Sequence, residues 1–510
     1  MQNSNFPKAL WLVVIIGFLI LYFYGLNFVP LLGPDEPRYS QIAREMFERN
    51  DWLTPTLGGY NWFEKPALLY WLQHFAYNIF GVSEFSARFF SAVFGLSIIL
   101  LIYRLCRRIE SMTERKGSNH AQNARGFAKF TAISLATSVG LIAFSRGASF
   151  DIILTFPITL ALFCFFTFEI YAPHGQSDHD FRGYYLSDVG FLGLFYVFIG
   201  LSILAKGLIG LVIPFGVVFT YYFFQFRFPQ RLFVFSWFWG IPLAALVAAT
   251  WYLPMYLTHG YGFIDEFFIQ HHLQRYTSNK YQHPQPFYFF WWVLPALTVP
   301  WVPFLLTSLW NIGSWRRGIA QLPIDYLRYF ALAWMLFPIV FFSFSGSKLP
   351  GYILPALPGA MILIGDGIRR FVSRNGTNEW LVFGLSSGTI IVCFILLSFI
   401  VKGVATHESV KFLIEKADAD GYRNAKIVNL HTVSHNAEFY GAKRVVRDES
   451  GKLKRFEAVS EVADEIKKDG RPVVALVPNQ YVNQLTESNL VAGNVLADNG
   501  ELSVVGVSLK

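Results

Sequence analysis

Two adjacent carboxylates form the first candidate chemical group of this sequence. Asp35 and Glu36 lie in the segment GPDEPRY at residues 33–39, and Arg38 follows three residues after the first of them. Adjacent carboxylates disfavour each other's charge, and a nearby arginine can offset this. An acid ahead of a proline is also an ordinary helix start, where its side chain caps free backbone amides. The pattern is compatible with both a helix cap and a catalytic acid or base, because a cap also fixes the side chain.

A second charged segment is WFEKP at residues 62–66. A lysine beside aromatic residues can be an anchor whose long side chain reaches the surface of a membrane. It can also be a point charge that holds a phosphate group. In that case Lys65 is one of several cations around an anionic substrate that undergoes group transfer. Further cations on the same predicted side are Arg146, Arg275, Lys280 and Lys348.

A third acid, Asp151, follows the segment SRGASF at residues 145–150, at the end of an apolar stretch. An acid in this position either faces a cavity or pairs with Arg146, and the sequence leaves both open. The adjacent histidines His271 and His272 are candidate metal ligands together with Glu64. Because neighbouring side chains point in different directions on a helix, one histidine at most needs to take part.

The sequence lacks the binding or catalytic motifs of several common enzyme classes. The sequence contains no P-loop, no glycine-rich dinucleotide motif, no nucleophile elbow and no CxxC pair. A nucleotide cofactor is therefore not implied.

The elements that must position these residues are mostly apolar. Of 510 residues, 54% are hydrophobic and only 15% are charged, against roughly 25% charged in average soluble proteins. This composition predicts an α-helical polytopic membrane protein. The three cysteines lie in apolar stretches, so no disulfide framework is expected.

Apolar runs of about 20 residues predict about eleven membrane spans, within a range of 11–13. The first run is too long for a removable signal peptide and is interpreted as an anchor. The expected spans lie near residues 9–29, 86–105, 127–146, 152–171, 184–204, 208–224, 233–255, 287–309, 329–345, 352–368 and 380–401.

Lysine and arginine are concentrated in one set of loops, which predicts that these loops and the N terminus are cytoplasmic. The net charge of +8 is then mostly a topology signal, and no nucleic acid is required to explain it. The residues of this set are Lys8, Arg107, Arg108, Arg115, Lys116, Arg125, Lys129, Arg227, Arg231, Arg316, Arg317, Arg328, Arg369, Arg370 and Arg374.

The remaining polar segments are expected on the opposite, periplasmic side. Residues 30–85 carry two amphipathic patterns, one with Tyr39, Ile42 and Met46 opposite Glu45, which predict helices lying on the membrane surface. Residues 403–510 have the composition of a soluble domain. They alternate short β-like runs, such as 426–430, 473–477 and 502–507, with helical pieces such as 458–468. The chain is thus expected to divide into a transmembrane catalytic domain, 1–402, and a small extracytoplasmic α/β domain, 403–510.

Residues 33–71, GPDEPRYSQIAREMFERNDWLTPTLGGYNWFEKPALLYW, resemble the start of the bacterial aminoarabinose–lipid A transferases. These enzymes belong to the GT-C class, which transfers sugars from polyprenyl phosphates, and are related to the protein O-mannosyltransferases. The resemblance continues in FFIQHHLQRY (267–276), SKLPGYILP (347–355) and HNAEFYGAKRVV (435–446). It covers nearly the whole chain. The pair FEKP and SKLPGY is more specific than the acidic motif.

The resemblance implies roles for nine of the twelve candidate site residues, and Tyr39, Arg146 and Arg275 are candidates from their own type and position. The catalytic acids are Asp35, Glu36 and Asp151; the substrate-binding residues are Arg38, Tyr39, Lys65, Arg146, Arg275, Lys348 and Tyr352; and a divalent metal would be held by Glu64 and His272. The sequence departs from the family pattern because it is shorter and because His271 replaces an acid, which weakens the metal assignment.

The function that the resemblance implies is sugar transfer from undecaprenyl phosphate to an acceptor on the periplasmic side of the bacterial inner membrane. The first expectation is aminoarabinose transferred to lipid A phosphate. The alternative is a mannosyltransferase-like enzyme that acts on another glycan or on protein hydroxyls. A lipid-linked sugar transporter is a remoter alternative, which predicts ionisable residues near the middle of spans. A receptor-like protein whose C-terminal domain binds a partner is a further one.

Overall fold

A computed structural model describes residues 7–115, 124–171, 186–267, 285–312 and 322–510. The chain forms two compact units. The helical unit comprises Met1–Tyr24, Phe63–Leu69 and Ser91–Cys393. The mixed unit comprises Gly25–Trp62, Tyr70–Phe90 and Phe394–Lys510. The predicted segment of residues 30–85 therefore falls mainly in the same unit as the C-terminal residues.

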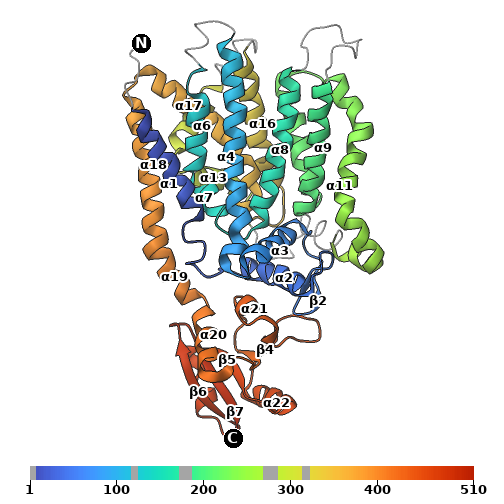
Figure 1. Cartoon of the computed structure of the whole chain (residues 1–510), viewed down its shortest axis with the longest axis vertical. Helices are drawn as coiled ribbons and strands as arrows, with labels where there is room; N and C mark the ends of the chain where they lie inside the picture. The colour runs from blue at the N-terminus through green and yellow to red at the C-terminus, as the bar shows by residue number, and fades with distance from the viewer. Residues whose placement is uncertain (1–6, 116–123, 172–185, 268–284, 313–321) are drawn as a thin grey trace. The chain divides into compact units, whose positions relative to one another are not determined.

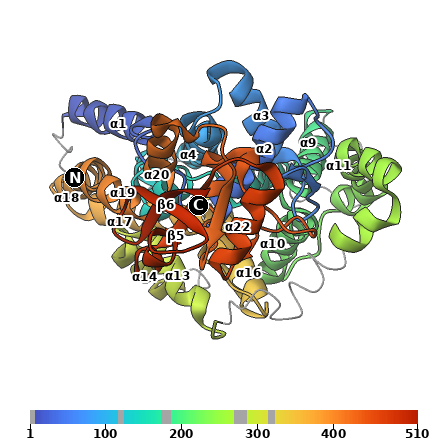
Figure 2. The same cartoon turned by 90° about the horizontal axis from the view of Figure 1, so that it is seen from below.

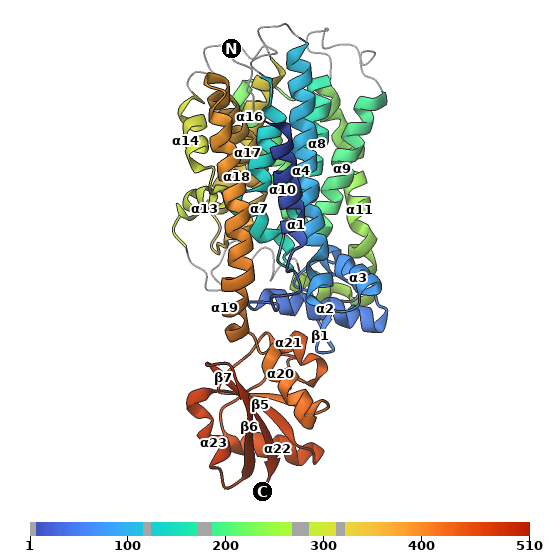
Figure 3. The ribbon, with the colours of Figure 1, turned by 60° about the vertical axis from the view of Figure 1, so that its left-hand side comes forward.

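The helical unit is built from apolar helices that run alongside one another (Figures 1 and 3). Helix α8 packs against α9, and α16 packs against α10 and α17. The helices that lie wholly or mainly in this unit are α1 (Lys8–Phe23), α4 (Glu84–Glu114), α6 (Phe127–Ala136), α7 (Val139–Phe144), α8 (Phe150–Tyr171), α9 (Leu186–Lys206), α10 (Ile209–Gln225), α11 (Arg231–Ile264), α13 (Phe289–Thr298), α14 (Val302–Trp310), α16 (Pro323–Ser343), η3 (Pro350–Ala356), α17 (Leu357–Arg374) and α18 (Asn378–Ile395).

Within the described residues, seven helices are long and apolar enough to cross a membrane. The pair α13 and α14 bends by 119° and counts as an eighth if it is one span. Shorter apolar helices, at Ala9–Phe23, Phe127–Ala136 and Ile209–Gln225, fall on three further expected spans. The expected span 287–309 is interrupted at Pro300, which has no N–H to donate to a helix. The chain is an α-helical polytopic membrane protein, as predicted; the total number of spans stays a prediction.

The mixed unit contains two helices and a short hairpin from the N-terminal half of the chain. Helix α2 spans Asp35–Arg49 and α3 spans Leu68–Phe80. Strands β1 (Thr56–Leu57) and β2 (Tyr60–Asn61) are antiparallel. Gly58 and Gly59, between them, both have positive φ, a conformation that glycine adopts without steric cost.

The burial of α2 corrects one expectation. Tyr39, Ile42 and Met46 are buried, as the pattern predicts, but Glu45, expected on the polar face, is only 1% exposed. Its carboxylate accepts hydrogen bonds from the Thr56 hydroxyl and from the amides of Gly58 and Gly59. Because the hairpin turn supplies these donors, the carboxylate can be buried while remaining hydrogen-bonded.

The C-terminal part of the mixed unit is a small α/β domain, as predicted. Its five-stranded sheet has the order β4-β3-β5-β7-β6, in which β4, β3 and β5 are parallel and β5, β7 and β6 are antiparallel. The elements are α19 (Val401–Glu408), α20 (Lys411–Ala417), β3 (Ile427–Leu430), α21 (Ala437–Tyr440), β4 (Arg455–Phe456), α22 (Val459–Asp469), β5 (Val473–Pro478), α23 (Asn483–Thr486), β6 (Val491–Asp498) and β7 (Leu502–Leu509).

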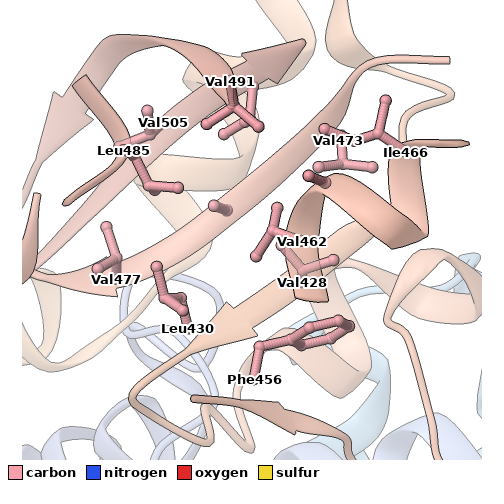
Figure 4. Close-up of a cluster of buried hydrophobic side chains, with 13 residues drawn as sticks. Val428, Leu430, Phe456, Val462, Ile466, Val473, Val477, Leu485, Val491 and Val505 are labelled. Carbon is pink, nitrogen blue, oxygen red and sulfur yellow. The ribbon is translucent and has the colours of Figure 1, made fainter. Parts of the chain in front are cut away.

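One face of this sheet is closed by α22 (Figure 2). Val462 and Ile466 of the helix pack on Val428, Leu430 and other apolar side chains of the strands (Figure 4). Burial of each such side chain stabilises the domain by roughly 1.5–3 kcal/mol. The central strand β5 is a continuous apolar run, and every second residue of β5 contributes to this core.

Candidate active site

The two acids of the mixed unit have different surroundings. Asp35 is the first residue of α2 and its side chain is 55% exposed; its nearest cation is Arg38, at 3.6 Å. The Glu36 carboxylate is mostly buried and is held by both ends of the Arg88 guanidinium, at 2.7 Å each. Asp35 is thus accessible to a ligand, whereas both Glu36 oxygens are occupied by an arginine.

Arg88 also holds the segment that precedes α2. Its guanidinium donates to the carbonyls of Leu26, Val29 and Pro30, at 2.6–2.8 Å. The amide of Leu32 donates to Glu36 at 2.9 Å. No side chain forms the N-terminal capping hydrogen bond of α2 that the sequence made possible. Glu36 instead accepts from an amide of the loop that precedes the helix. Arg88 is not among the site residues predicted from the sequence, although a charged residue in an apolar helix is a recognisable signal.

Arg38 contacts two side chains of the C-terminal segment HNAEFYGAKRVV. A guanidinium nitrogen lies 3.3 Å from the His435 ring, and another lies 3.7 Å from the buried Glu438 carboxylate. Glu438 pairs in addition with Arg447, at 3.2 Å. The Arg38 guanidinium also lies over the Trp62 ring, 5.5 Å from its centre. Tertiary contacts therefore fix the arginine of the acidic motif.

Tyr440 forms a second connection between α21 and the acidic segment. Its hydroxyl accepts from the amide of Leu31, at 2.8 Å, and donates to Glu84, at 3.1 Å. Glu84 is also paired with Lys411, at 2.6 Å. Burial raises the pKa of Tyr440 well above its usual value, so its hydroxyl stays protonated.

Tyr39, predicted to bind substrate, is buried and its ring lies 6.5 Å from that of Tyr70.

The helical unit contains a second group of predicted residues. Asp151, in the first turn of α8, forms an ion pair with Lys206 at the end of α9. The Lys206 ammonium lies 5.0 Å from the centre of the Tyr352 ring. A Cβ atom added to Gly351 would lie 1.9 Å from an Asp151 oxygen, so only glycine permits this approach. The segment SKLPGY and the third acid are thus brought together by Lys206, which is not among the site residues predicted from the sequence.

Arg146 does not pair with Asp151, which corrects one of the two expectations for this acid. Its guanidinium donates to the carbonyls of Leu21 and Tyr24, at 2.6 Å each. These carbonyls lie at the C-terminal end of α1, where the last turn has no helical donors of its own. The helix end therefore takes the arginine, and Lys206 is the partner of Asp151.

Lys348 and Lys65 are both buried cations of the helical unit. Lys348 is 7% exposed and donates to the carbonyls of Ser345 and Gln285, at 2.7 and 3.0 Å. Lys65 is 8% exposed, and Glu64 beside it is half-buried. The Lys348 ammonium group is held by neutral carbonyls and keeps its full charge available to an anion.

The metal prediction is not tested by this structure. Among the described ranges, no three His, Cys, Asp or Glu side chains come together as a metal site. The predicted partner of Glu64, His272, and the predicted substrate cation Arg275 lie outside the described residues, as do His271 and Lys280. The divalent metal stays a prediction.

Comparison with known proteins agrees with this fold. The model of the dolichyl-phosphate-mannose-protein mannosyltransferase family matches residues 9–261. Over 98% of both chains, the structure is similar to the crystal structure of ArnT from Cupriavidus metallidurans bound to undecaprenyl phosphate, with a TM-score of 0.76 and 20% identity. The oligosaccharyltransferase AglB from Archaeoglobus fulgidus is similar with a TM-score of 0.54 and 12% identity, over 98% of this chain and 74% of that one. The fold is that of a GT-C membrane glycosyltransferase.

The sequence is similar to proteins named undecaprenyl phosphate-α-4-amino-4-deoxy-L-arabinose arabinosyl transferase. The relative from Edwardsiella ictaluri is 31% identical over 72% of this chain and 60% of its own. The relative from Wigglesworthia glossinidia brevipalpis is 28% identical over 73% of this chain and 61% of its own. The resemblance to the aminoarabinose transferases is thus confirmed, and the chain is a multi-pass inner-membrane protein. The alignments span less than two thirds of the length of these relatives.

Proposed function

We propose that this protein is a glycosyltransferase that moves 4-amino-4-deoxy-L-arabinose from undecaprenyl phosphate to a phosphate of lipid A. The observation that carries the proposal is the alignment, at 31% identity over 72% of the chain, with a protein named for transfer of this sugar. The fold similarity to ArnT adds support. The reaction faces the periplasm, with the N terminus in the cytoplasm and the C-terminal domain in the periplasm.

In the proposed reaction, an acceptor oxygen attacks the anomeric carbon and the bond to the lipid phosphate breaks. The leaving undecaprenyl phosphate takes the electron pair. Lys65, Lys348 and Lys206 are the proposed cations for its charge. Lys65 and Lys348 are buried and the Lys206 side chain is 19% exposed, and ammonium groups stabilise a phosphate strongly in a medium of low dielectric constant. Asp151 would hold Lys206 in place through their ion pair.

Asp35 is the proposed group for the acceptor, because it is the exposed acid of the acidic motif. A lipid A phosphate is already anionic and requires positioning rather than deprotonation. A sugar or protein hydroxyl requires removal of a proton by a base. Asp35 would therefore position a lipid A phosphate, or act as a general base if the acceptor is a hydroxyl group.

The alternative function is transfer of a hexose from a polyprenyl phosphate to another glycan or to protein hydroxyls. It is favoured by the match of residues 9–261 to the mannosyltransferase family. This alternative keeps the donor and the reaction class and changes the sugar and the acceptor.

The test is a transfer assay with the purified full chain in lipid vesicles. We expect mass spectrometry to find aminoarabinose on lipid A when undecaprenyl-phosphate aminoarabinose is the donor, and loss of this product in Lys65→Met. The matched control is Lys454→Met, on the C-terminal domain. Unmodified lipid A in cells with the gene, together with another glycan that gains a sugar, would replace the first proposal by the alternative.

A further inference from the structure

A cavity of about 280 Å³ lies in the helical unit, where the C-terminal ends of α4 and α17 meet the N-terminal end of α16. None of its lining residues was selected for the proposed sugar transfer. A water molecule takes about 30 Å³ of liquid volume, so the cavity has room for a phosphate group and the atoms next to it. Its polar lining consists of Thr113, Asp325, Arg328, Arg369, Arg370 and Ser373.

The arginines of this cavity converge on one buried carboxylate. Asp366, 2% exposed, accepts from Arg328 at 2.9 and 3.1 Å and from Arg369 at 2.6 and 3.1 Å. Arg370 approaches the same carboxylate at 3.1 Å. Asp325 accepts from Arg328 at 2.7 Å. Among the described residues of this site, three guanidinium groups thus pair with two carboxylates, so the arginines outnumber these acidic partners by one.

An excess charge in a partly buried place is costly unless an opposite charge compensates it. Arg369 is almost completely buried and Arg328 is 16% exposed, so water compensates them only weakly. Asp366 already accepts from all three arginines and has little capacity for further donors. An anion in the cavity would therefore be bound by guanidinium groups that are already held in position.

We propose that this cavity binds the phosphate group of an anionic phospholipid. Guanidinium groups match phosphate oxygens in geometry and charge. Leu322 and Ile324 line the cavity as well and offer an apolar surface to the glycerol and the first acyl carbons. Basic pockets between membrane helices on the cytoplasmic side are a known type of anionic-lipid site. The arginine-rich loops around this end carry the cytoplasmic signal of the sequence.

The proposed lipid site is independent of the sugar-transfer proposal, because it shares no residue with it. The test uses the full chain, purified in detergent and freed of lipid, and measures binding by native mass spectrometry. The probes are phosphatidylglycerol, phosphatidylcholine with the same acyl chains, and inorganic phosphate. We expect the parent protein to bind phosphatidylglycerol at least tenfold more tightly than phosphatidylcholine, which is about the effect of one charge-assisted hydrogen bond.

Two variants make this test specific. Arg370→Gln should lower the affinity for phosphatidylglycerol roughly tenfold. The control Arg374→Gln removes an exposed charge of the same helix outside the cavity. It should change this affinity by less than about twofold. Ser373→Asp places a negative charge at the exposed edge of the cavity and retains all three arginines. It should lower the same affinity even if Arg370→Gln does not fold.

Three results would overturn the proposal. One is equal binding of the two phospholipids by the parent protein. Another is an equal loss in Arg374→Gln and Arg370→Gln, which would indicate a general surface-charge effect. The third is binding of inorganic phosphate without any preference for phosphatidylglycerol over phosphatidylcholine, which would assign the cavity to a free anion.

Discussion

Replacing Arg88 by glutamine tests whether this arginine organises the acidic segment. Arg88 is 4% exposed and donates five hydrogen bonds, two to Glu36 and three to backbone carbonyls. Glutamine retains one short amide and no charge. Breaking a buried ion pair by removing one partner costs about 3–5 kcal/mol. Because Glu36 is 13% exposed and keeps the Leu32 amide, we expect the lower end, about 3 kcal/mol.

The assay is the free energy of unfolding of the full chain in mixed micelles, combined with the sugar-transfer rate. We expect the rate of Arg88→Gln to fall about 10²-fold, because a displacement of about 1 Å in a catalytic group has this effect. The double variant Arg88→Gln/Glu36→Gln should lose less stability than the two single losses added together, since it leaves no unpaired buried carboxylate.

Arg104→Gln is the matched control, since Arg104 is an exposed residue of the same helix. We expect its free energy of unfolding to lie within about 0.5 kcal/mol of that of the parent protein. The reasoning would be refuted if Arg88→Gln behaved like this control in both stability and transfer rate. Strictly additive losses in the double variant would refute the ion-pair part of the argument alone.

Three further predictions concern other contacts. Tyr440→Phe should cost about 1–3 kcal/mol in unfolding free energy, because the amide of Leu31 loses its acceptor. Lys206→Met should lower the transfer rate about 10²–10³-fold by removing a cation and unpairing Asp151, as steady-state kinetics with the polyprenyl donor would show. Burial raises the pKa of the Glu465 carboxyl, but hydrogen bonds from Lys426 and Lys468 lower it by more, so the pKa lies below its usual value. The contribution of Glu465 to the free energy of unfolding is therefore present above pH 4.5 and lost as the pH falls. Glu465→Gln should remove this part of the pH dependence of unfolding, as denaturant titrations at several pH values would show.

Each of these predictions has a control in the same element or domain. Tyr481→Phe removes a tyrosine hydroxyl elsewhere in the C-terminal domain and should leave stability unchanged within about 0.5 kcal/mol. Lys206→Arg keeps the charge and should recover part of the lost rate; a rate equal to that of Lys206→Met would contradict a role for the charge. Glu461→Gln, on the same helix as Glu465, should keep the pH dependence of the parent protein.

The sequence by itself determined the apolar helices and the C-terminal α/β domain. A helix in a membrane satisfies its own backbone, so a run of about 20 apolar residues is sufficient to indicate it. The β-like runs at 426–430, 473–477 and 502–507 and the helical piece at 458–468 coincide with β3, β5, β7 and α22, because their periodicity is a local property. The residues of the acidic motif and of SKLPGY were likewise visible as unusual polar segments in an apolar chain.

Only the tertiary structure decided which charges pair with one another. Arg88 and Glu36 are 52 residues apart, Lys206 and Asp151 are 55 apart, and Arg38 meets His435 over 397 residues. Pairing of Arg146 with Asp151 was one of the two alternatives that proximity in sequence left open, yet the Arg146 guanidinium donates to the carbonyls at the end of α1. An ion pair depends on distances of a few ångströms between side chains, and sequence periodicity carries no information on which distant segments come that close. The sequence therefore identified the chemical groups, and the fold determined how each is held.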